Sequence, residues 1–117
     1  MTLEESFLDQ VAEDIIADLN FTRPEPSTKW SDEWLQWAAG RYDVPVPTLG
    51  AIQRYVKNRL QPGGFLSAVL RHDLFEATFQ ADEQNLQSLT DIVLLIHNHA
   101  PAESHGSSER IRYWLEG

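Results

Sequence analysis

Four histidines offer the widest choice of chemistry in this sequence, because an imidazole can bind a metal ion or exchange a proton near neutral pH. They are His72, His97, His99 and His105. Two metal ligands on one helix need a spacing of three or four residues, whereas His97 and His99 lie two apart. We therefore expect no metal or other cofactor, and we interpret these histidines as side chains near the C-terminal end of a helix.

Asp73 and Glu76 are carboxylates whose spacing could support acid–base catalysis, since they lie three residues apart on a predicted helix. Asp73 also falls between Leu70 and Leu74 in the apolar stripe of that helix. An ionised carboxylate is costly to bury unless it is hydrogen-bonded or paired. We therefore predict a buried, structural Asp73, bonded to a neighbouring helix N-terminus or to a cation such as Arg54. A metal-dependent hydrolase that uses Asp73, Glu76 and the histidines is an alternative.

Three other polar motifs have a structural interpretation. Ser107 follows Gly106 but lacks the G-x-S-x-G pattern of a nucleophilic serine, which favours a helix cap. The Pro-Gly-Gly turn at residues 62–64 lacks the Gly-Lys-Ser/Thr sequence of a phosphate-binding loop. Asn98 is expected to form an internal polar contact beside the inner face of a helix. The sequence thus indicates no catalytic residue, and we expect a protein that is not an enzyme.

Trp30, Trp34 and Trp37 follow the i, i+4, i+7 spacing of one stripe on a helix and its first turn. Core packing is the default interpretation of such a stripe. If the stripe is partly exposed, it becomes the preferred protein-binding surface, because large aromatic side chains contribute much of the free energy at interfaces.

Charge is divided unevenly along the 117 residues, whose net charge is −9. Residues 1–47 hold ten acidic residues and three Lys or Arg, and residues 73–117 hold eight and two. The segment between them has no acidic residue and four cations. These cations, which would support the alternative function of a nucleic-acid-binding regulator, are Arg54, Lys57, Arg59 and Arg71. Because the excess of acid repels nucleic acid, we expect a protein partner instead.

Hydrophobic periodicity and helix-capping residues predict an all-α fold of about six short helices. Ser31, Thr48 and Asp82 are the predicted N-caps of the second, third and fifth helices. The predicted helices span approximately 2–20, 31–40, 48–60, 65–77, 82–96 and 108–116. The chain is long enough for a single compact domain. We expect residues 48–117 to form a helical core and residues 1–47 to form an N-terminal helical extension. The inner face of the helix at 82–96 is expected to consist of Leu86, Leu89, Ile92, Val93 and Ile96.

The composition also limits the class of protein. Cysteine is absent, so the sequence predicts neither a disulfide nor a thiolate metal site. The first residues are acidic rather than basic, and no signal peptide is expected. No apolar segment approaches the ~20 residues of a membrane span. We expect a soluble, cytoplasmic protein with no membrane partner, and the sequence leaves its oligomeric state open.

A series of short motifs runs through residues 51–115. They are Tyr55-Val56, Pro62-Gly63-Gly64-Phe65-Leu66, Ala68-Val69-Leu70, Asp73-Leu74, Ala81-Asp82, Asn85, Asn98, Ala100-Pro101, Gly106-Ser107 and Trp114-Leu115. Together they resemble a group of small proteins carried by phages, prophages and other mobile elements. The resemblance implies an accessory protein that acts on host machinery, and it implies no activity or catalytic residues.

The expected function combines this setting with the acidic charge. Asp9, Glu13 and Asp14 lie on the polar side of the first predicted helix. Such a surface could occupy the basic channel of a complex that handles nucleic acid. We therefore expect a non-enzymatic protein that binds another protein of the host cell, and these three residues, with the tryptophans, are its predicted contacts. Inhibition of a nucleic-acid-handling or defence complex is the form of this function that we favour.

Overall fold

The computed structural model describes residues 24–117, and every regular element in that range is a helix. In chain order these are α2 (Asp32–Arg41), α3 (Val46–Asn58), α4 (Gly64–Leu70), α5 (Leu74–Gln80), α6 (Glu83–Gln87), α7 (Leu89–His99), the 3₁₀ turn η1 (Ala102–Ser104) and α8 (Ser108–Glu116). The predicted all-α fold is confirmed. None of the helices in residues 24–117 combines the length and apolar composition needed to cross a membrane. The helix predicted at 2–20 lies outside the described residues.

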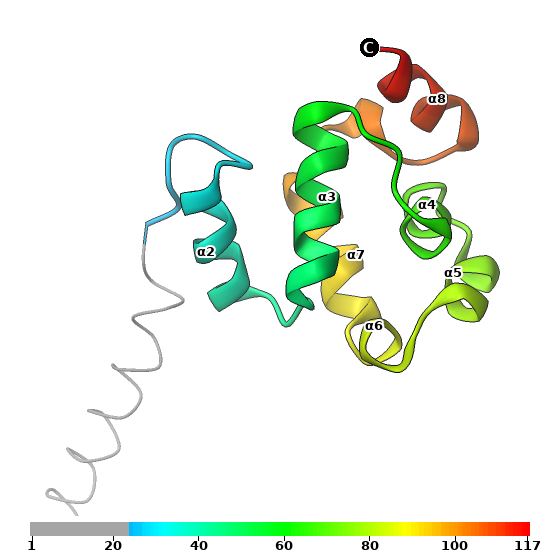
Figure 1. Cartoon of the computed structure of the whole chain (residues 1–117), viewed down its shortest axis with the longest axis horizontal. Coiled ribbons are helices and arrows are strands. Elements are labelled where there is room, and N and C mark those ends of the chain that lie inside the picture. The colour runs from blue at the N-terminus through cyan, green and yellow to red at the C-terminus, as the bar shows by residue number, and fades with distance from the viewer. Residues whose placement is uncertain (1–23) are drawn as a thin grey trace, which may run out of the picture.

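α3 is the central element of the fold, with α2 on one side and α4 and α5 on the other (Figure 1). α7 lies behind α3, and α8 lies near its C-terminal end (Figure 1). Side chains from α2, α3, α4, α5, α7 and α8 form one hydrophobic core. Its largest fully buried side chains include Trp34, Ile52, Tyr55, Leu70, Ile92 and Leu95. Burying an apolar side chain of this size contributes roughly 1.5–3 kcal/mol, so this core is the main source of stability. α2 packs in the same core as residues 48–117, and the described part is one domain.

α2 begins where the sequence predicts. The Ser31 hydroxyl accepts a hydrogen bond from the backbone N–H of Trp34 at 3.2 Å, which satisfies one of the unpaired donors at a helix start. Trp30, just before this cap, is buried, and Leu35 is half-buried against the core, as a hydrophobic staple requires. The sequence predicts an end at Gly40, but α2 continues to Arg41.

α3 begins two residues earlier than predicted. Thr48 is the cap that the sequence predicts, but the helix starts at Val46 and places Pro47 in its first turn, where the missing proline N–H costs nothing. The Thr48 hydroxyl is free to donate to Asn85 Oδ1 at 2.5 Å, which connects α3 to α6. α3 ends at Asn58, and the C-cap residue Arg59 adopts a left-handed conformation with φ 59°.

The single helix predicted at 65–77 is wrong, because the chain forms α4 and α5 with a sharp turn between them. His72 adopts a left-handed conformation, with φ 64°, and this ends the α-helical path. Asp73 is extended, and its side chain accepts a hydrogen bond from the N–H of Glu76 at 3.1 Å. Asp73 is therefore the N-cap of α5, and its side chain is 45% exposed rather than buried.

The helix predicted at 82–96 is also two helices. Asp82 caps α6, as expected, by accepting from the N–H of Asn85 at 2.8 Å. At the buried Ser88 the chain changes direction and α7 begins. The turn rotates the apolar side chains of α6 relative to those of α7, so Leu86 is exposed instead of facing the core. Val93 is also exposed, whereas Ile92 and Ile96 are buried as predicted.

The C-terminal elements are held to α3 by Tyr55 and Arg59. The Tyr55 hydroxyl donates to the backbone carbonyl of Ser104 at 2.6 Å, and burial raises the pKa of this phenol to about 12 although Arg59 acts in the opposite direction. The indole N–H of Trp114 donates to the Tyr55 carbonyl at 3.0 Å. The Arg59 guanidinium lies over the Trp114 ring, 3.5 Å from its centroid. Ser107 caps α8 as predicted, by accepting from the N–H of Arg110.

Candidate functional site

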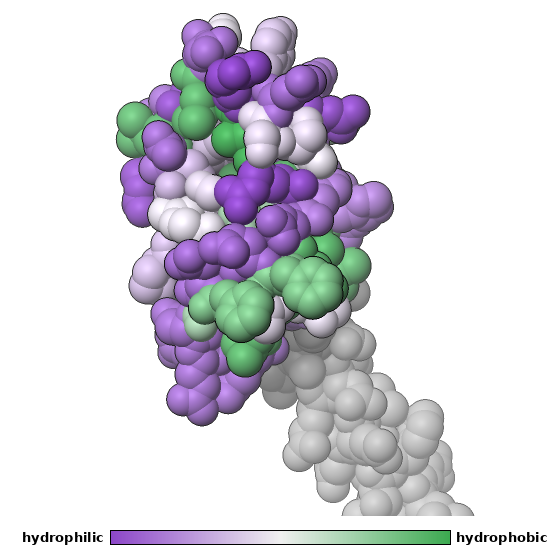
Figure 2. Space-filling view, turned by 90° about the vertical axis from the view of Figure 1, so that its right-hand side faces the viewer, coloured by the Kyte–Doolittle hydropathy of each residue, from purple (hydrophilic) through white to green (hydrophobic). Residues whose placement is uncertain are grey.

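Several large apolar side chains of α5 and α7 are exposed to solvent. On α5, Leu74, Phe75 and Phe79 are 66%, 80% and 82% exposed, and on α7 Val93 and Leu94 are nearly half exposed. Figure 2 shows apolar side chains gathered on the side of the molecule that α5 forms, with hydrophilic side chains around them. We call these five residues the apolar face. Large apolar side chains exposed together in this way often mark a binding site.

An open groove of about 320 Å³ separates α5 from α7 and adjoins the apolar face. Its walls are mostly apolar, and the residues that line it are Val69, Leu74, Ala77, Leu89, Val93, Leu94 and Ile96, with His72, Asp73, His97 and His105. α5 is seven residues long and buries only Ala77, so it covers the core poorly and leaves most of its surface to solvent. The short helix thus creates both the groove and the apolar face.

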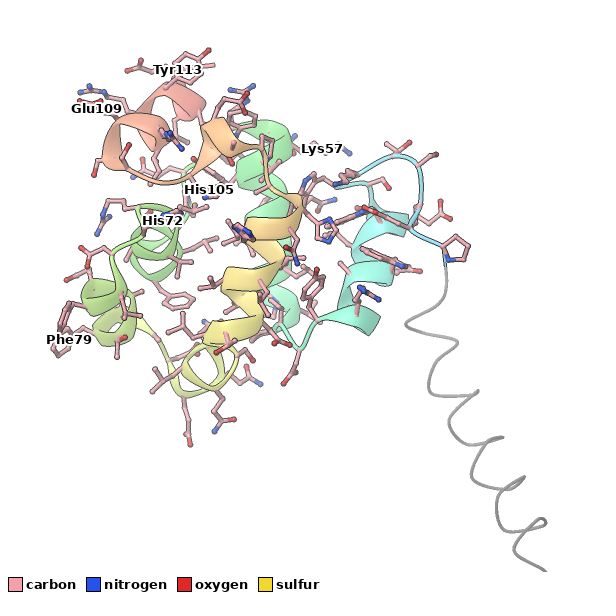
Figure 3. The ribbon with its side chains drawn as sticks, turned by 180° about the vertical axis from the view of Figure 1, so that it is seen from behind. Lys57, His72, Phe79, His105, Glu109 and Tyr113 are labelled. Carbon is pink, nitrogen blue, oxygen red and sulfur yellow. The ribbon has the colours of Figure 1, made fainter. Side chains whose placement is uncertain are left out.

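A pair of histidines lies at one end of the groove. His72 follows α4 and His105 follows η1, and the two side chains point toward each other (Figure 3). The His72 Nε2 and His105 Nδ1 atoms are 2.8 Å apart, so one imidazole donates a hydrogen bond to the other. Next to His105, the N–H of Gly106 donates to the Leu70 carbonyl at 2.7 Å. These contacts join the end of α4 to the segment that leads into α8.

Burial lowers the pKa of His105, and the neighbouring His72, Arg110 and His97 lower it further. The neutral form of His105 is therefore favoured, and a neutral imidazole can donate or accept the hydrogen bond to His72. The Nη1 atom of Arg110 also contacts this segment, because it donates to the backbone carbonyls of Ala102 and His105, each at 3.2 Å. The histidine pair is thus well placed to hold two chain segments together.

The groove does not assemble the groups of the hydrolase alternative. Asp73 lines it, but one of its carboxylate oxygens is used to cap α5, and Glu76 is bonded to Gln80 at 2.9 Å. Across residues 24–117, no three His, Cys, Asp or Glu side chains meet in an arrangement suited to a metal ion. His99 lies away from the groove, in the contact between α2 and α7. The geometry offers an apolar binding surface with a polar end.

The tryptophans predicted as a protein-binding stripe belong to the core. Trp30, Trp34 and Trp37 are 5%, 0% and 6% exposed, so they present almost no surface to a partner. Their rings lie in a row, with centroids 4.5 Å apart for Trp30 and Trp34 and 5.7 Å apart for Trp34 and Trp37. The stripe is therefore core, as the default interpretation has it, and the partial exposure on which the protein-binding interpretation depends is absent; the His99 ring of α7 packs against Trp34 and Trp37.

His99 is the residue through which α7 contacts this stripe. Its ring packs edge-on against Trp34 and Trp37, and its Nε2 lies 3.0 Å from the Tyr42 hydroxyl. Asn98 is exposed rather than internal, yet its amide donates to the same hydroxyl at 3.1 Å. Burial lowers the pKa of His99, mainly by removing water from the imidazole. The contact holds α2 against α7.

The four cations of the predicted basic segment differ in their surroundings. Arg59 is half-buried, stacks on Trp114 and donates to its carbonyl at 2.8 Å. Arg71 forms an ion pair with Asp73 at 3.7 Å. Arg54 and Lys57 lie on α3, and both are exposed. Two of the four cations thus have structural partners, which reduces the positive surface that a polyanion could contact. Asp9, Glu13 and Asp14 lie outside the described residues.

One spacing in the sequence indicates the apolar face, although the prediction of a single helix at 65–77 overlooks it. Phe75 and Phe79 are four residues apart, the spacing of one stripe on a helix, and this stripe differs from the one that holds Leu70 and Ala77. Two apolar stripes on one short helix cannot both face the same core. That conflict predicts an exposed aromatic pair.

No protein-family model matches the chain, and neither a curated protein nor a solved structure matches it. The resemblance to proteins of phages and other mobile elements therefore stays a prediction.

Proposed function

We propose that this chain is a non-enzymatic protein that binds another protein of the host cell through its apolar face. The single observation that carries this proposal is the exposure of Phe75 and Phe79, at 80% and 82%, beside an apolar groove. Two phenyl rings in water forgo several kcal/mol of burial that a partner would recover. Aromatic residues are also the side chains most enriched at the centres of interfaces.

A finer proposal concerns the partner. The net charge of −9 and the resemblance to mobile-element proteins support inhibition of a host complex that handles nucleic acid or acts in defence. A basic surface on such a complex would be attracted to this chain over a distance of about one Debye length, ~8 Å at physiological ionic strength. The apolar face would then provide the short-range contact.

Affinity capture from a bacterial lysate tests this function when the same experiment compares three forms of the tagged, full-length chain. These are the unaltered chain, a Phe75→Ser/Phe79→Ser double variant and a Tyr113→Ser control. Tyr113 is 65% exposed on α8 and lies at the other end of the molecule from Phe79 (Figure 3). We expect a stoichiometric partner with the unaltered chain and the control, and its loss with the double variant. Equal capture by all three forms would contradict the proposed site.

A further inference from the structure

The helices α5, α6 and α7 and their N-caps include acidic residues and neither Lys nor Arg. Between Arg71 and Arg110 the chain has seven acidic residues and neither Lys nor Arg. Five of the seven belong to α5, α6 and α7 or cap them: Asp73, Glu76, Asp82, Glu83 and Asp91. Of these, Asp73 lines the groove, Glu76 lies on α5 next to Phe75, and Glu83 is exposed on α6. Asp82 lines a separate hollow with Thr48, and Asp91 is bonded to Asp43 just before α3. The acidic border of the apolar face therefore consists of Asp73, Glu76 and Glu83.

Most of these carboxylates accept hydrogen bonds from uncharged donors, and such donors do not neutralise the negative charge. Glu76 accepts from the amide of Gln80, and Asp82 accepts from the N–H of Asn85. Asp91 accepts from the N–H of Asp43 at 2.6 Å. Asp73 has a nearby cation, Arg71 at 3.7 Å, on a pair that is partly exposed to solvent. A ligand that brings positive charge to this border would meet an excess of carboxylates over cations.

We propose that the groove binds an amphipathic helix whose polar side is basic, supplied by the partner protein. This inference rests on the proposed function and specifies the chemistry of the partner. The apolar stripe of such a helix would lie against Leu74, Val93 and Leu94, with Phe75 and Phe79 extending the contact along α5. Its Lys and Arg side chains would reach the acidic border. Apolar contact supplies most of the affinity, and the charges select the partner and speed its association.

Electrostatics disfavours the other occupants of an apolar groove. The chain's own residues 1–20 have a hydrophobic pattern of the right kind but carry six acidic residues and no Lys or Arg. A second copy that docked by the same face would bring the same carboxylates into contact with each other. Anionic lipid headgroups and nucleic-acid phosphates would be repelled in the same way. A basic helix is the occupant that both the shape and the charge of the surface accept.

Two labelled peptides of about 18 residues test the inference, because that length forms a stable amphipathic helix on binding. Both peptides share a leucine stripe at i, i+3, i+4 and i+7, and their polar positions are all lysine in one and all glutamate in the other. Fluorescence anisotropy is measured with the full-length chain, the Phe75→Ser/Phe79→Ser variant, the Tyr113→Ser control and a Glu76→Gln/Glu83→Gln variant.

We expect the lysine peptide to bind roughly tenfold or more tightly than the glutamate peptide, a difference of at least about 1.4 kcal/mol. The phenylalanine variant should lose this binding, the Tyr113→Ser control should keep it, and Glu76→Gln/Glu83→Gln should reduce the preference for lysine. Added salt should weaken the lysine peptide more than the glutamate peptide.

Other outcomes separate the inference from the function on which it rests. If both peptides bind equally and both are lost in the phenylalanine variant, the basic partner is wrong and the docking surface stands. If the lysine peptide binds the phenylalanine variant as well as the unaltered chain, the attraction is general and the groove is not its site. If neither peptide binds, the inference is overturned, while capture from a lysate that depends on Phe75 and Phe79 would still support the proposed function.

Discussion

Two aromatic stripes in this protein share a spacing and differ in their surroundings. Trp30 and Trp34 lie four residues apart at the start of α2, and Phe75 and Phe79 lie four apart at α5. The tryptophans are at most 5% exposed, whereas the phenylalanines are at least 80% exposed. The spacing places side chains on one side of a helix, but only the neighbouring elements decide whether that side is covered.

The neighbours of the two stripes explain the difference. The α2 stripe meets the His99 ring of α7, and Trp34 donates its indole N–H to Glu25 at 2.7 Å. α5 packs chiefly against α4 through Ala77, which leaves the side with Phe75 and Phe79 without a covering helix among residues 24–117. One stripe therefore stabilises the domain, and the other is available for a partner.

The largest effect is expected from Trp34→Ala. The indole is fully buried, and its removal leaves a large cavity and takes a hydrogen-bond donor from Glu25, which should lower the free energy of unfolding by about 3–5 kcal/mol. Urea denaturation followed by circular dichroism measures this change. Trp34→Phe is the matched control and should lose less. A loss below about 1 kcal/mol for Trp34→Ala would show that the α2 stripe is not part of the core.

A smaller loss is expected when the caps of the two helices are removed. Ser31→Ala at α2 and Asp73→Ala at α5 each take away the acceptor of one helix N–H, which should cost about 1 kcal/mol. A buried carboxylate, as the sequence suggests for Asp73, would cost several times more. Equal melting temperatures for Asp73→Ala and the unaltered chain would contradict the cap, and Asp73→Asn should retain most of the stability.

Acid should destabilise both regions through their histidines. The pKa values of His99, beside the α2 stripe, and of His105, at the groove, are lowered from 6.5 in the folded chain, chiefly by burial. The unfolded chain thus takes up protons more readily, so stability is fully present above about pH 6.5 and falls as the pH drops through the folded pKa. Melting curves from neutral to acidic pH measure this slope.

Substitution of each histidine assigns the slope to its region. His99→Gln and His105→Gln should each make stability less dependent on pH in this range, because each removes one group whose protonation favours unfolding. His72→Gln is the control for the partner of His105. If neither His99→Gln nor His105→Gln changes the slope, other groups determine the acid sensitivity.

The smallest effect on stability is expected from the Phe75→Ser/Phe79→Ser variant, although it should abolish partner binding. Both rings are already in water, so the free energy of unfolding should change by no more than about 0.5 kcal/mol per position. The same urea denaturation measures it beside Trp34→Ala. A loss of several kcal/mol would mean that a further part of the chain covers these rings, and the contrast between the two stripes would fail.

The local features of the fold were the most predictable. The sequence predicts Ser31, Asp82 and Ser107 as helix caps, and each side chain accepts the hydrogen bond that this role requires. Capping is a contact with a residue two or three positions away, so the sequence alone contains it. Periodicity also predicts the burial of Ile92 and Ile96 correctly.

The breaks between helices were not predictable in the same way. His72 has a side chain that normally avoids a positive φ, and neither glycine nor proline lies between Leu66 and Gln80 to mark the turn. The backbone N–H groups of His72 and Asp73 close the turn by donating to Val69 and Ala68. A distant segment adds two further contacts, the bond between His72 and His105 and the bond from the Gly106 N–H to Leu70. Once the helix is broken there, Asp73 becomes a cap and Leu74 faces water.

By itself, the sequence determined the all-α fold, the positions of several helix starts and the excess of acidic residues in α5, α6 and α7. These depend on residue types and short-range contacts, which are properties of the chain itself. Only the tertiary structure decided which apolar stripes are covered, because coverage depends on the direction each helix takes after its turn. For that reason the tryptophans became core, and the phenylalanines of α5 became the candidate binding surface.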